Sequence, residues 1–142
     1  MRRIRSNIDP QSAGFRAFES HNRRLAAELH ERQRNARFDR PQRDVQRLRK
    51  QKKLLVRERI DLLLDPETPF LELSTLAACE TYEGTVPSAA LVSGIGIVSG
   101  REVMIMASDS SIKGGAWYPM TIRKMVRTLD IAIENRLTMI HL

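Results

Sequence analysis

The chain has 142 residues, 42% of them hydrophobic and 29% charged, which is typical of a globular protein with a real core. Its single cysteine, Cys79, excludes an intrachain disulfide and a zinc cluster and favours a reducing compartment. No run approaches the roughly 18 apolar residues that span a bilayer. The start, MRRIRSNIDP, is rich in arginine but lacks the apolar region of a secretory signal. We therefore expect a cytoplasmic protein with no membrane partner.

The positive charge is confined to the N-terminal part of the chain. Residues 1–60 contain 18 Lys and Arg against 7 Asp and Glu, whereas residues 61–142 contain 6 against 10. Such a basic arm could bind nucleic acid or an anionic surface, although no nucleic-acid-binding module is recognisable. We favour a charged helical arm that packs one face on a partner. A noncatalytic interaction protein and a basic nucleic-acid-binding module stay as alternatives.

Two helices are expected in this arm. Ser12 is a natural N-cap for a helix that continues to about Arg34, with one apolar stripe formed by Phe15, Phe18, Leu25 and Leu29. Pro41 interrupts it. A second helix is predicted from about Arg43 to Asp65. Its apolar side consists of Leu54, Leu55, Ile60, Leu63 and Leu64.

Strands follow the arm. Residues 70–76, FLELSTL, predict a short strand with Leu71 and Leu73 on one face around Glu72, and residues 79–88 predict a loop. The runs AALVSGIGIVSG and REVMIMAS predict two strands joined by a hairpin at residues 99–101.

The glycines in the first of these runs do not form a dinucleotide-binding fingerprint. Gly94, Gly96 and Gly100 are spaced G-x-G-x-x-x-G inside a strand pattern. A phosphate-binding turn instead needs its glycines to open a helix. We expect these residues to allow close backbone approach or twist.

The stretch SDSSIKGGAWYP, residues 108–119, has the context of a ligand-binding loop. It follows the strand EVMIMA, and Pro119 suits the first turn of a helix. That helix has apolar residues at three- and four-residue spacings, namely Ile122, Met125, Val126, Leu129 and Ile133. The run LTMIHL then predicts a strand parallel to EVMIMA. Loops at the carboxyl ends of strands in α/β sheets bind ligands, but glycines at such a corner can also be purely structural.

The order of these segments resembles a known family. KLLVRERIDLLLDPETPFLELS and GIGIVSGREVMIMASDSSIKGGAWYPMTIRKMVRTLDIAIENRL are similar to the N-terminal part of carboxyltransferase (β) subunits of biotin-dependent acyl-CoA carboxylases. The methylcrotonyl-CoA and geranyl-CoA types match best. The resemblance covers nearly the whole chain, but Lys52-Lys53 stands where the family usually has Gly-Lys, and Val56 replaces a proline. Family members also continue beyond the position of Leu142, into a loop that holds the thioester and a second domain.

The resemblance implies an α/β, crotonase-like ββα superhelix, here partial and preceded by the arm. Residues 1–66 would form the arm and residues 67–142 the first part of the acyl-CoA carboxyltransferase domain. The implied reaction moves a carboxyl group from carboxybiotin to an acyl-CoA, with biotin on a separate carrier domain. Implied partners are acyl-CoA, a biotin carboxylase or biotin carrier subunit, and further copies in a homo-oligomer, in the cytoplasm of a bacterium. No nucleic-acid partner is expected, and the fragment alone is expected to be inactive.

In a site of this family an enolate oxygen needs preorganised N–H donors. The resemblance therefore implies that the N–H groups near Gly114 and Gly115 line the acyl-CoA pocket. Its wall would be formed by Ala107 and Ser108. Lys113 would meet a CoA phosphate or cap the loop.

Tyr118, with Trp117 beside it, would cover the ligand or form a hydrophobic plug under the helix. Asp109 is a general base by residue type, but an aspartate at a loop start commonly caps a turn. We assign no catalytic residue, give His141 no catalytic role and expect no metal in this segment.

Overall fold

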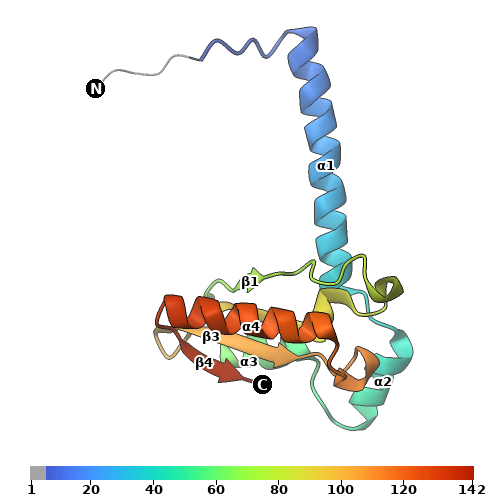
Figure 1. Cartoon of the computed structure of the whole chain (residues 1–142), viewed down its shortest axis with the longest axis vertical. Helices are drawn as coiled ribbons and strands as arrows, with labels where there is room; N and C mark the ends of the chain where they lie inside the picture. Colours follow the sequence, from blue (N-terminus) through green and yellow to red (C-terminus); the bar gives the residue numbers. More distant parts are fainter. Residues whose placement is uncertain (1–5) are drawn as a thin grey trace.

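The computed structural model describes residues 6–142; the arginine-rich start at residues 1–5, in which we found no secretory signal, lies outside them. Helix α1 (Ala13–Phe38) stands away from a body in which a small sheet lies between helices (Figure 1). The Oγ atom of Ser12 accepts a hydrogen bond from the N–H of Phe15 at 3.2 Å, which confirms the expected N-cap. The helix continues four residues beyond the expected Arg34 and ends at Phe38, with Asp39 as its C-cap, two residues before Pro41.

The apolar stripe of α1 is open to solvent. Phe18 is 71% exposed, and Leu25 and Leu29 are also exposed. Only the last turns of α1 meet the body, where Ala36 is buried. The described part of the chain contains no helix with both the length and the apolarity needed to cross a bilayer.

The single helix expected from Arg43 to Asp65 is wrong, because the chain forms two helices there. Helix α2 (Gln42–Lys50) and helix α3 (Val56–Leu63) are separated by a turn. The N–H of Lys53 donates to the carbonyl of Leu48 at 3.0 Å, and that of Lys52 to the carbonyl of Arg49 at 2.9 Å. With Lys52 at φ 57°, these bonds form the Schellman motif that ends a helix, usually at a glycine.

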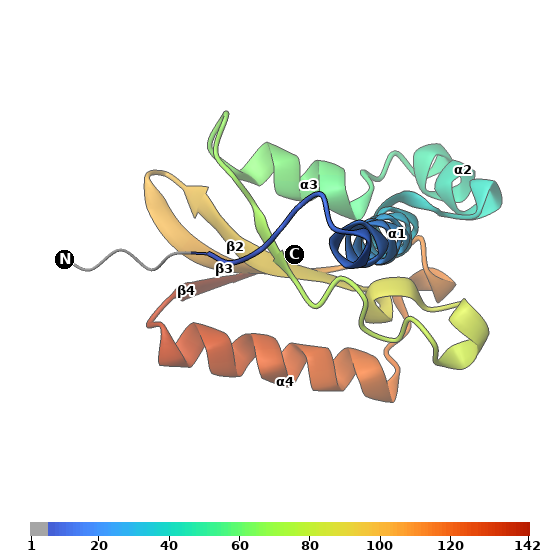
Figure 2. The same cartoon turned by 90° about the horizontal axis from the view of Figure 1, so that it is seen from above.

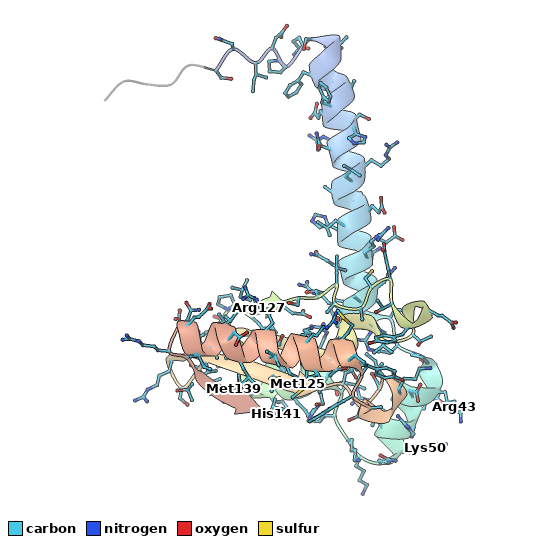
Figure 3. The ribbon with its side chains drawn as sticks, in the orientation of Figure 1. Arg43, Lys50, Met125, Arg127, Met139 and His141 are labelled. Atoms are coloured by element: carbon cyan, nitrogen blue, oxygen red, sulfur yellow. The ribbon has the colours of Figure 1, made fainter. Side chains whose placement is uncertain are left out.

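The sheet has the order β1-β2-β3-β4. Its strands are β1 (Leu71–Leu73), β2 (Leu91–Val98), β3 (Arg101–Ser108) and β4 (Thr138–His141). The pairs β1/β2 and β2/β3 are antiparallel, and β3/β4 is parallel. The expected hairpin and the expected parallel pair are both confirmed. His141 lies exposed near the end of β4 (Figure 3).

The glycines inside β2 allow close approach, as expected. A Cβ atom on Gly94 would lie 2.5 Å from the backbone oxygen of Leu71, and one on Gly96 would lie 2.3 Å from Cδ2 of Leu64. Neither position has room for a side chain. Glycine at both positions therefore lets Leu71 and Leu64 pack directly against the backbone of β2.

Helices cover both faces of the sheet (Figure 2). Helix α3 covers one face, where Val56 and Ile60 share a core with the strand residues Val92, Val103, Ile105 and Ala107. Because α3 belongs to this core, the body includes residues from before position 66. The domain boundary at residue 66 stays a prediction.

Helix α4 (Pro119–Glu134) covers the other face, and it starts with proline in its first turn as expected. The apolar stripe of α4, however, does not pack on the sheet. Its residues Ile122, Val126, Leu129 and Ile133 are exposed. The buried side of the helix consists of Thr121, Lys124, Thr128 and Ala132.

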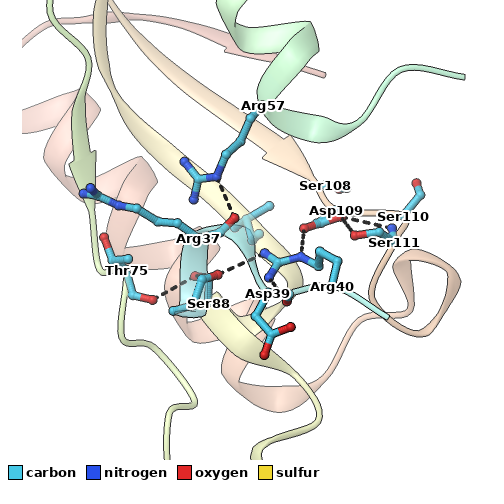
Figure 4. Close-up of polar contacts among 12 residues, drawn as sticks. Arg37, Asp39, Arg40, Arg57, Thr75, Ser88, Ser108, Asp109, Ser110 and Ser111 are labelled. Carbon is cyan, nitrogen blue, oxygen red and sulfur yellow. Dashed lines mark hydrogen bonds and ion pairs between the residues drawn. The ribbon is translucent and has the colours of Figure 1, made fainter. Parts of the chain in front are cut away.

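The glutamate of β1 points inward, on the face opposite to the one that Leu71 and Leu73 were expected to share. The Glu72 side chain is 3% exposed, whereas Leu71 is 62% exposed. Arg57 on α3 donates two hydrogen bonds to the Glu72 carboxylate, each 2.9 Å long. Nε of Arg37 lies 2.9 Å from the same carboxylate, and Nε of Arg57 donates to the Arg37 carbonyl at 3.0 Å (Figure 4). This ion cluster joins the base of α1 to the sheet.

Candidate functional site

The candidate site begins where β3 ends. Strand β3 leads into residues 109–118, which return to the start of α4 through a short 3₁₀ turn at Lys113–Gly115. Lys113, Gly114 and Gly115 all have positive φ angles, of 46°, 70° and 86°. Two of these three positions are glycines, the residues that adopt this conformation at least cost. The paired glycines therefore serve the corner between strand and helix, whatever else they do.

Within the Lys113–Gly115 turn, two backbone N–H groups have no partner among the described residues, and elsewhere in the loop the same holds for Ser110 and Trp117. The N–H of Gly115 donates to the carbonyl of Ile112 at 2.8 Å, and that of Ala116 donates to Lys113 at 3.3 Å. Within residues 6–142, the N–H groups of Lys113 and Gly114 make no hydrogen bond. The donors available to a ligand are thus shifted one residue toward the N-terminus from the expected pair.

A cavity of about 550 Å³ lies beside this loop. Its walls are the C-terminal end of α1, the linker to α2, the 3₁₀ turn at Pro87–Ala90 and the loop residues Ser111, Ile112 and Lys113. Of the six residues expected to bind a ligand, Lys113 borders this cavity and is exposed. Its volume is within the range of small-molecule sites.

The other expected site residues have structural neighbours. Ala107 is fully buried in the core shared with α3. Tyr118 packs against Tyr82, with ring centroids 4.9 Å apart at an angle of 50°. Tyr82 and Tyr118 both border a small apolar cluster of Val86, Ala90 and Ile112. Tyr118 therefore plugs the space beneath the start of α4, whereas Trp117 is 58% exposed.

Asp109 is buried and caps a turn, as its position suggested. Its Oδ1 accepts hydrogen bonds from the N–H of Ser111 at 3.0 Å and from the Ser111 hydroxyl at 2.5 Å. Its Oδ2 accepts from Nε of Arg40 at 2.9 Å (Figure 4). With every contact serving a turn or an ion pair, this carboxylate has the environment of a structural group.

The arginines of the arm were seen in the sequence only as net charge. Arg59 donates to the carbonyl of Ser108 at 2.5 Å, and Arg47 donates to the carbonyl of Ser110 at 2.9 Å. Together with Arg40 they bond to three consecutive residues of the loop. By contrast, Arg43 and Lys50 on α2 point outward to solvent (Figure 3). Much of the arm's arginine content therefore binds the body of the same chain.

Lys124 donates hydrogen bonds to a second segment with positive φ angles, the 3₁₀ turn at Pro87–Ala90 and the residue that follows it. Ser88, Ala89 and Ala90 all have positive φ angles, between 52° and 55°. Nζ of Lys124 donates to the carbonyls of Leu91 at 2.6 Å and Ser88 at 3.1 Å. Burial lowers the pKa of Lys124 to about 8, and the negative charge of Glu72 partly opposes this shift.

This role also escaped the sequence reasoning, although a pattern for it exists. Thr121, Lys124 and Thr128 recur at three- and four-residue spacings and so share one side of α4. The hydroxyl of Thr121 donates to the carbonyl of Ala89 at 2.8 Å, and that of Thr128 donates to the carbonyl of Lys124 at 2.7 Å. Polar residues in helical register were the signal for an inward polar face.

Residues 6–142 contain no group of three or more histidine, cysteine or acidic side chains placed to hold a metal ion.

Comparison with known proteins gives this site its family. Residues 47–142 match the carboxyl transferase domain, and the chain belongs to that family. It is 44% identical over 133 residues to the biotin-dependent 3-methylcrotonyl-coenzyme A carboxylase beta1 subunit of Mycobacterium tuberculosis, covering 94% of this chain and 25% of that protein. It is 52% identical over 98 residues to the mitochondrial methylcrotonoyl-CoA carboxylase beta chain of Arabidopsis thaliana, covering 69% and 17% of the two chains.

Solved structures agree with these relatives. The beta subunit of geranyl-CoA carboxylase from P. aeruginosa superposes with a TM-score of 0.68 at 32% identity, over 98% of this chain and 26% of that one. Transcarboxylase 12S gives a TM-score of 0.68 at 26% identity, over 87% and 24% of the two chains. The family resemblance and the crotonase-like α/β fold are thereby confirmed. The chain spans about a quarter of the length of these structures.

Proposed function

We propose that this chain forms the acyl-CoA-binding part of a biotin-dependent carboxyltransferase subunit. The observation that carries the proposal is the carboxyl transferase match over residues 47–142, which includes the whole strand–loop–helix unit around Lys113–Gly115. The similar proteins named for methylcrotonyl-CoA and geranyl-CoA carboxylases favour a branched, unsaturated acyl group. Carboxybiotin, delivered on a separate carrier, would supply the carboxyl group.

In this proposal the loop stabilises negative charge. Loss of a proton from the acyl group leaves an enolate, whose thioester oxygen needs donors fixed in place before the reaction. The N–H groups of Lys113 and Gly114 have no internal partner in the described residues, so they are the donors we assign to acyl-CoA. The exposed ammonium of Lys113, at the wall of the 550 Å³ cavity, suits a CoA phosphate. Of the other four expected residues, Ala107 lies in the core, Ser108 ends β3, Gly115 closes the turn by donating to Ile112, and Tyr118 packs on Tyr82.

Substitutions in the loop test the proposal in the parent carboxyltransferase subunit. Gly114→Val places a β-branched residue at a φ of 70°, which should displace the N–H of that position and lower turnover by roughly 10²–10³, the usual effect of losing one oxyanion donor. Lys113→Ala should mainly raise KM, since a phosphate contact is shared by ground and transition states. Ile105→Val in β3 is the matched control and should change stability by only about 0.5–1.5 kcal/mol. Folded Gly114→Val protein with wild-type turnover and acyl-CoA affinity would remove the loop from the site.

We further propose that residues 1–142 alone transfer no carboxyl group. The chain spans about a quarter of its relatives, and we infer that the remainder of the parent subunit supplies the surface for the biotin carrier. An assay with a carboxybiotin donor and methylcrotonyl-, geranyl-, propionyl- and acetyl-CoA should show no turnover by the purified chain. Turnover by this chain would contradict the proposed division of the site.

The parent subunit is proposed to form a homo-oligomer that works with a biotin carboxylase and biotin carrier subunit. Exposed apolar stripes on α1 and α4 support self-association, and transcarboxylase 12S is described as a hexamer assembly. Residues 1–142 should sediment as associated species, and Val126→Glu with Ile133→Glu should reduce that association. A well-behaved wild-type monomer at high concentration would argue against it.

A cytoplasmic location is proposed because the single cysteine favours a reducing compartment. Cell fractionation with an antibody to the chain would test it.

An interaction protein that binds through α1 is the second candidate, favoured by the exposure of Phe18 and Leu25. Loss of a partner on Phe18→Ser, without loss of acyl-CoA binding, would support that candidate.

A further inference from the structure

We propose that the basic arm positions the candidate acyl-CoA loop through three arginines, Arg40, Arg47 and Arg59. They come from three different parts of the arm. Arg40 lies in the linker between α1 and α2, Arg47 lies on α2, and Arg59 lies on α3. Their partners are adjacent in sequence, at Ser108, Asp109 and Ser110. This inference rests on the proposed function for the statement that the loop binds acyl-CoA. The arginine contacts themselves do not depend on that proposal.

The three contacts set the orientation of the peptide groups that start the loop. The carbonyl of Ser108 accepts from Arg59, while the N–H on the same peptide, that of Asp109, donates to the carbonyl of Ala90 at 3.0 Å. The carbonyl of Ser110 accepts from Arg47, and the N–H on that peptide, from Ser111, donates to the Asp109 carboxylate at 3.0 Å. A peptide plane bonded at both ends cannot rotate without breaking a hydrogen bond.

Arg40 adds the buried part of the arrangement. Its side chain is 8% exposed and that of Asp109 is 2% exposed. Arg40 also donates to the carbonyls of Asp39 at 2.7 Å and Ala36 at 3.0 Å, so the guanidinium is bound to the base of α1 and to the loop at once. A hydrogen bond to a charged group is among the stronger ones in proteins. The loop therefore has one charged contact deep in the body and two nearer the surface.

Through these contacts the arm sets the direction in which the N–H groups of Lys113 and Gly114 point. The carbonyls of Ser108 and Ser110 and Oδ2 of Asp109 accept from the arginines, and the carbonyl of Asp109 accepts from the N–H of Ile112 at 3.1 Å. Among residues 111–116, the N–H groups without a partner in the described residues are those of Lys113 and Gly114. The arm thus acts on the ligand through the loop, which makes the three arginines positioning residues.

Arg47 is the residue on which to test this inference. Arg40→Met would leave the Asp109 carboxylate buried without its counter-charge, and the variant could fail to fold. Arg47 is only partly covered, with 44% of its side chain exposed. Arg49, two residues further on α2, is a matched control because its side chain is 48% exposed and it bonds to Glu58 within the arm. Arg47→Gln and Arg49→Gln make the same chemical change on the same helix.

Hydrogen–deuterium exchange on residues 1–142 reports on the loop directly. Arg47→Gln should speed exchange of the peptide 109–116 by about tenfold, since a charged hydrogen bond on its backbone is lost. Arg49→Gln should leave that peptide unchanged, and Arg47→Lys should restore part of the protection. Exchange of 109–116 that is equal in Arg47→Gln and Arg49→Gln would show that Arg47 does not position the loop.

Activity of the parent subunit separates this inference from the proposed function. With methylcrotonyl-CoA as the substrate, Arg47→Gln should lower kcat/KM by about tenfold, the same loss of one charged contact, while Arg49→Gln stays at the wild-type value. Local loosening with unchanged kcat/KM would overturn the link between arm and site. Absence of carboxyltransferase activity in the wild-type parent would overturn the proposed function alone, because the exchange result would still decide whether the arm holds the loop.

Discussion

Helices α3 and α4 cover opposite faces of the same sheet in opposite ways. Helix α3 inserts Val56 and Ile60 into the sheet, at 5% and 2% exposure. Helix α4 inserts threonines and a lysine and leaves its apolar stripe outside, with Ile133 at 74% exposure. One helix therefore has its apolar surface satisfied within the chain, and the other presents that surface to solvent.

This difference shows that an apolar stripe identifies a helix without identifying its neighbour. Burial of apolar area is nondirectional, so a stripe can be covered by any element that reaches it. The inward face of α4 uses specific polar bonds instead, from Lys124 to Leu91 and from Thr121 to Ala89. The inner face of α4 needs hydrogen bonds of defined direction, whereas its outer face needs only another surface that buries its apolar side chains.

The largest effect should come from making the same change on both helices. Ile60→Ala should destabilise residues 1–142 by about 2–5 kcal/mol, because it opens a cavity in a filled core. Ile133→Ala should change stability by no more than about 0.5 kcal/mol, because the side chain is exposed. Urea denaturation of both variants, at a protein concentration at which residues 1–142 do not associate, measures the difference. Equal losses would mean that the α4 stripe is buried in solution, and the comparison would fail.

A pH effect should follow from the buried ammonium of α4. The folded-state pKa of Lys124 is about 8, against an ordinary value of 10.5. Between these values the unfolded chain binds more protons than the folded chain, so stability should rise as pH increases from about 8 to 10. The contribution approaches about 1.4 kcal/mol per pH unit at its steepest. Below pH 8 both states are protonated and the slope from this group vanishes.

Lys124→Met is the control, since it removes the titrating group and keeps an unbranched side chain. The difference in unfolding free energy between the wild type and this variant, followed from pH 7 to 10 by urea denaturation, isolates Lys124 from other titrating groups. Parallel profiles would show that Lys124 is hydrated in solution.

The smallest expected effect concerns how the helices end. Helix α2 ends at Lys52 with φ 57°, and helix α4 ends in the same manner at Arg136 with φ 53°. Lys52→Gly and Arg136→Gly should each stabilise the chain by about 0.5–1 kcal/mol, because glycine adopts this conformation without strain. Lys50→Gly, at the last residue of α2, should instead destabilise by up to about 1 kcal/mol. Thermal unfolding of the three variants would reveal the opposite signs, and a loss at Lys52 equal to that at Lys50 would refute the motif.

The same lysine explains the error in the predicted arm. A C-terminal glycine is the strongest local signal for a helix end, and position 52 lacks it, so the pattern from Arg43 to Asp65 resembled one helix. The resemblance to carboxyltransferases contained the missing signal, because that family usually has glycine there. The family pattern thus carries a signal for this turn that the local residues of this chain lack.

The sequence by itself determined the order of the four strands and of α4, the hairpin at Ser99–Gly100, the parallel pair of β3 and β4, and the loop with Lys113 and two glycines. Each of these follows from a short-range cause, such as side-chain alternation or a residue that tolerates positive φ.

Only the tertiary structure decided which faces are buried and what the arm does. It turned Glu72 inward against Arg57, turned the α4 stripe outward, and brought Arg47 to Ser110 across 63 positions of the chain. A charged side chain has no preferred partner until the fold brings one within reach, and its burial is favourable only when that partner is present. Contacts of this kind depend on the whole fold, so local pattern does not contain them.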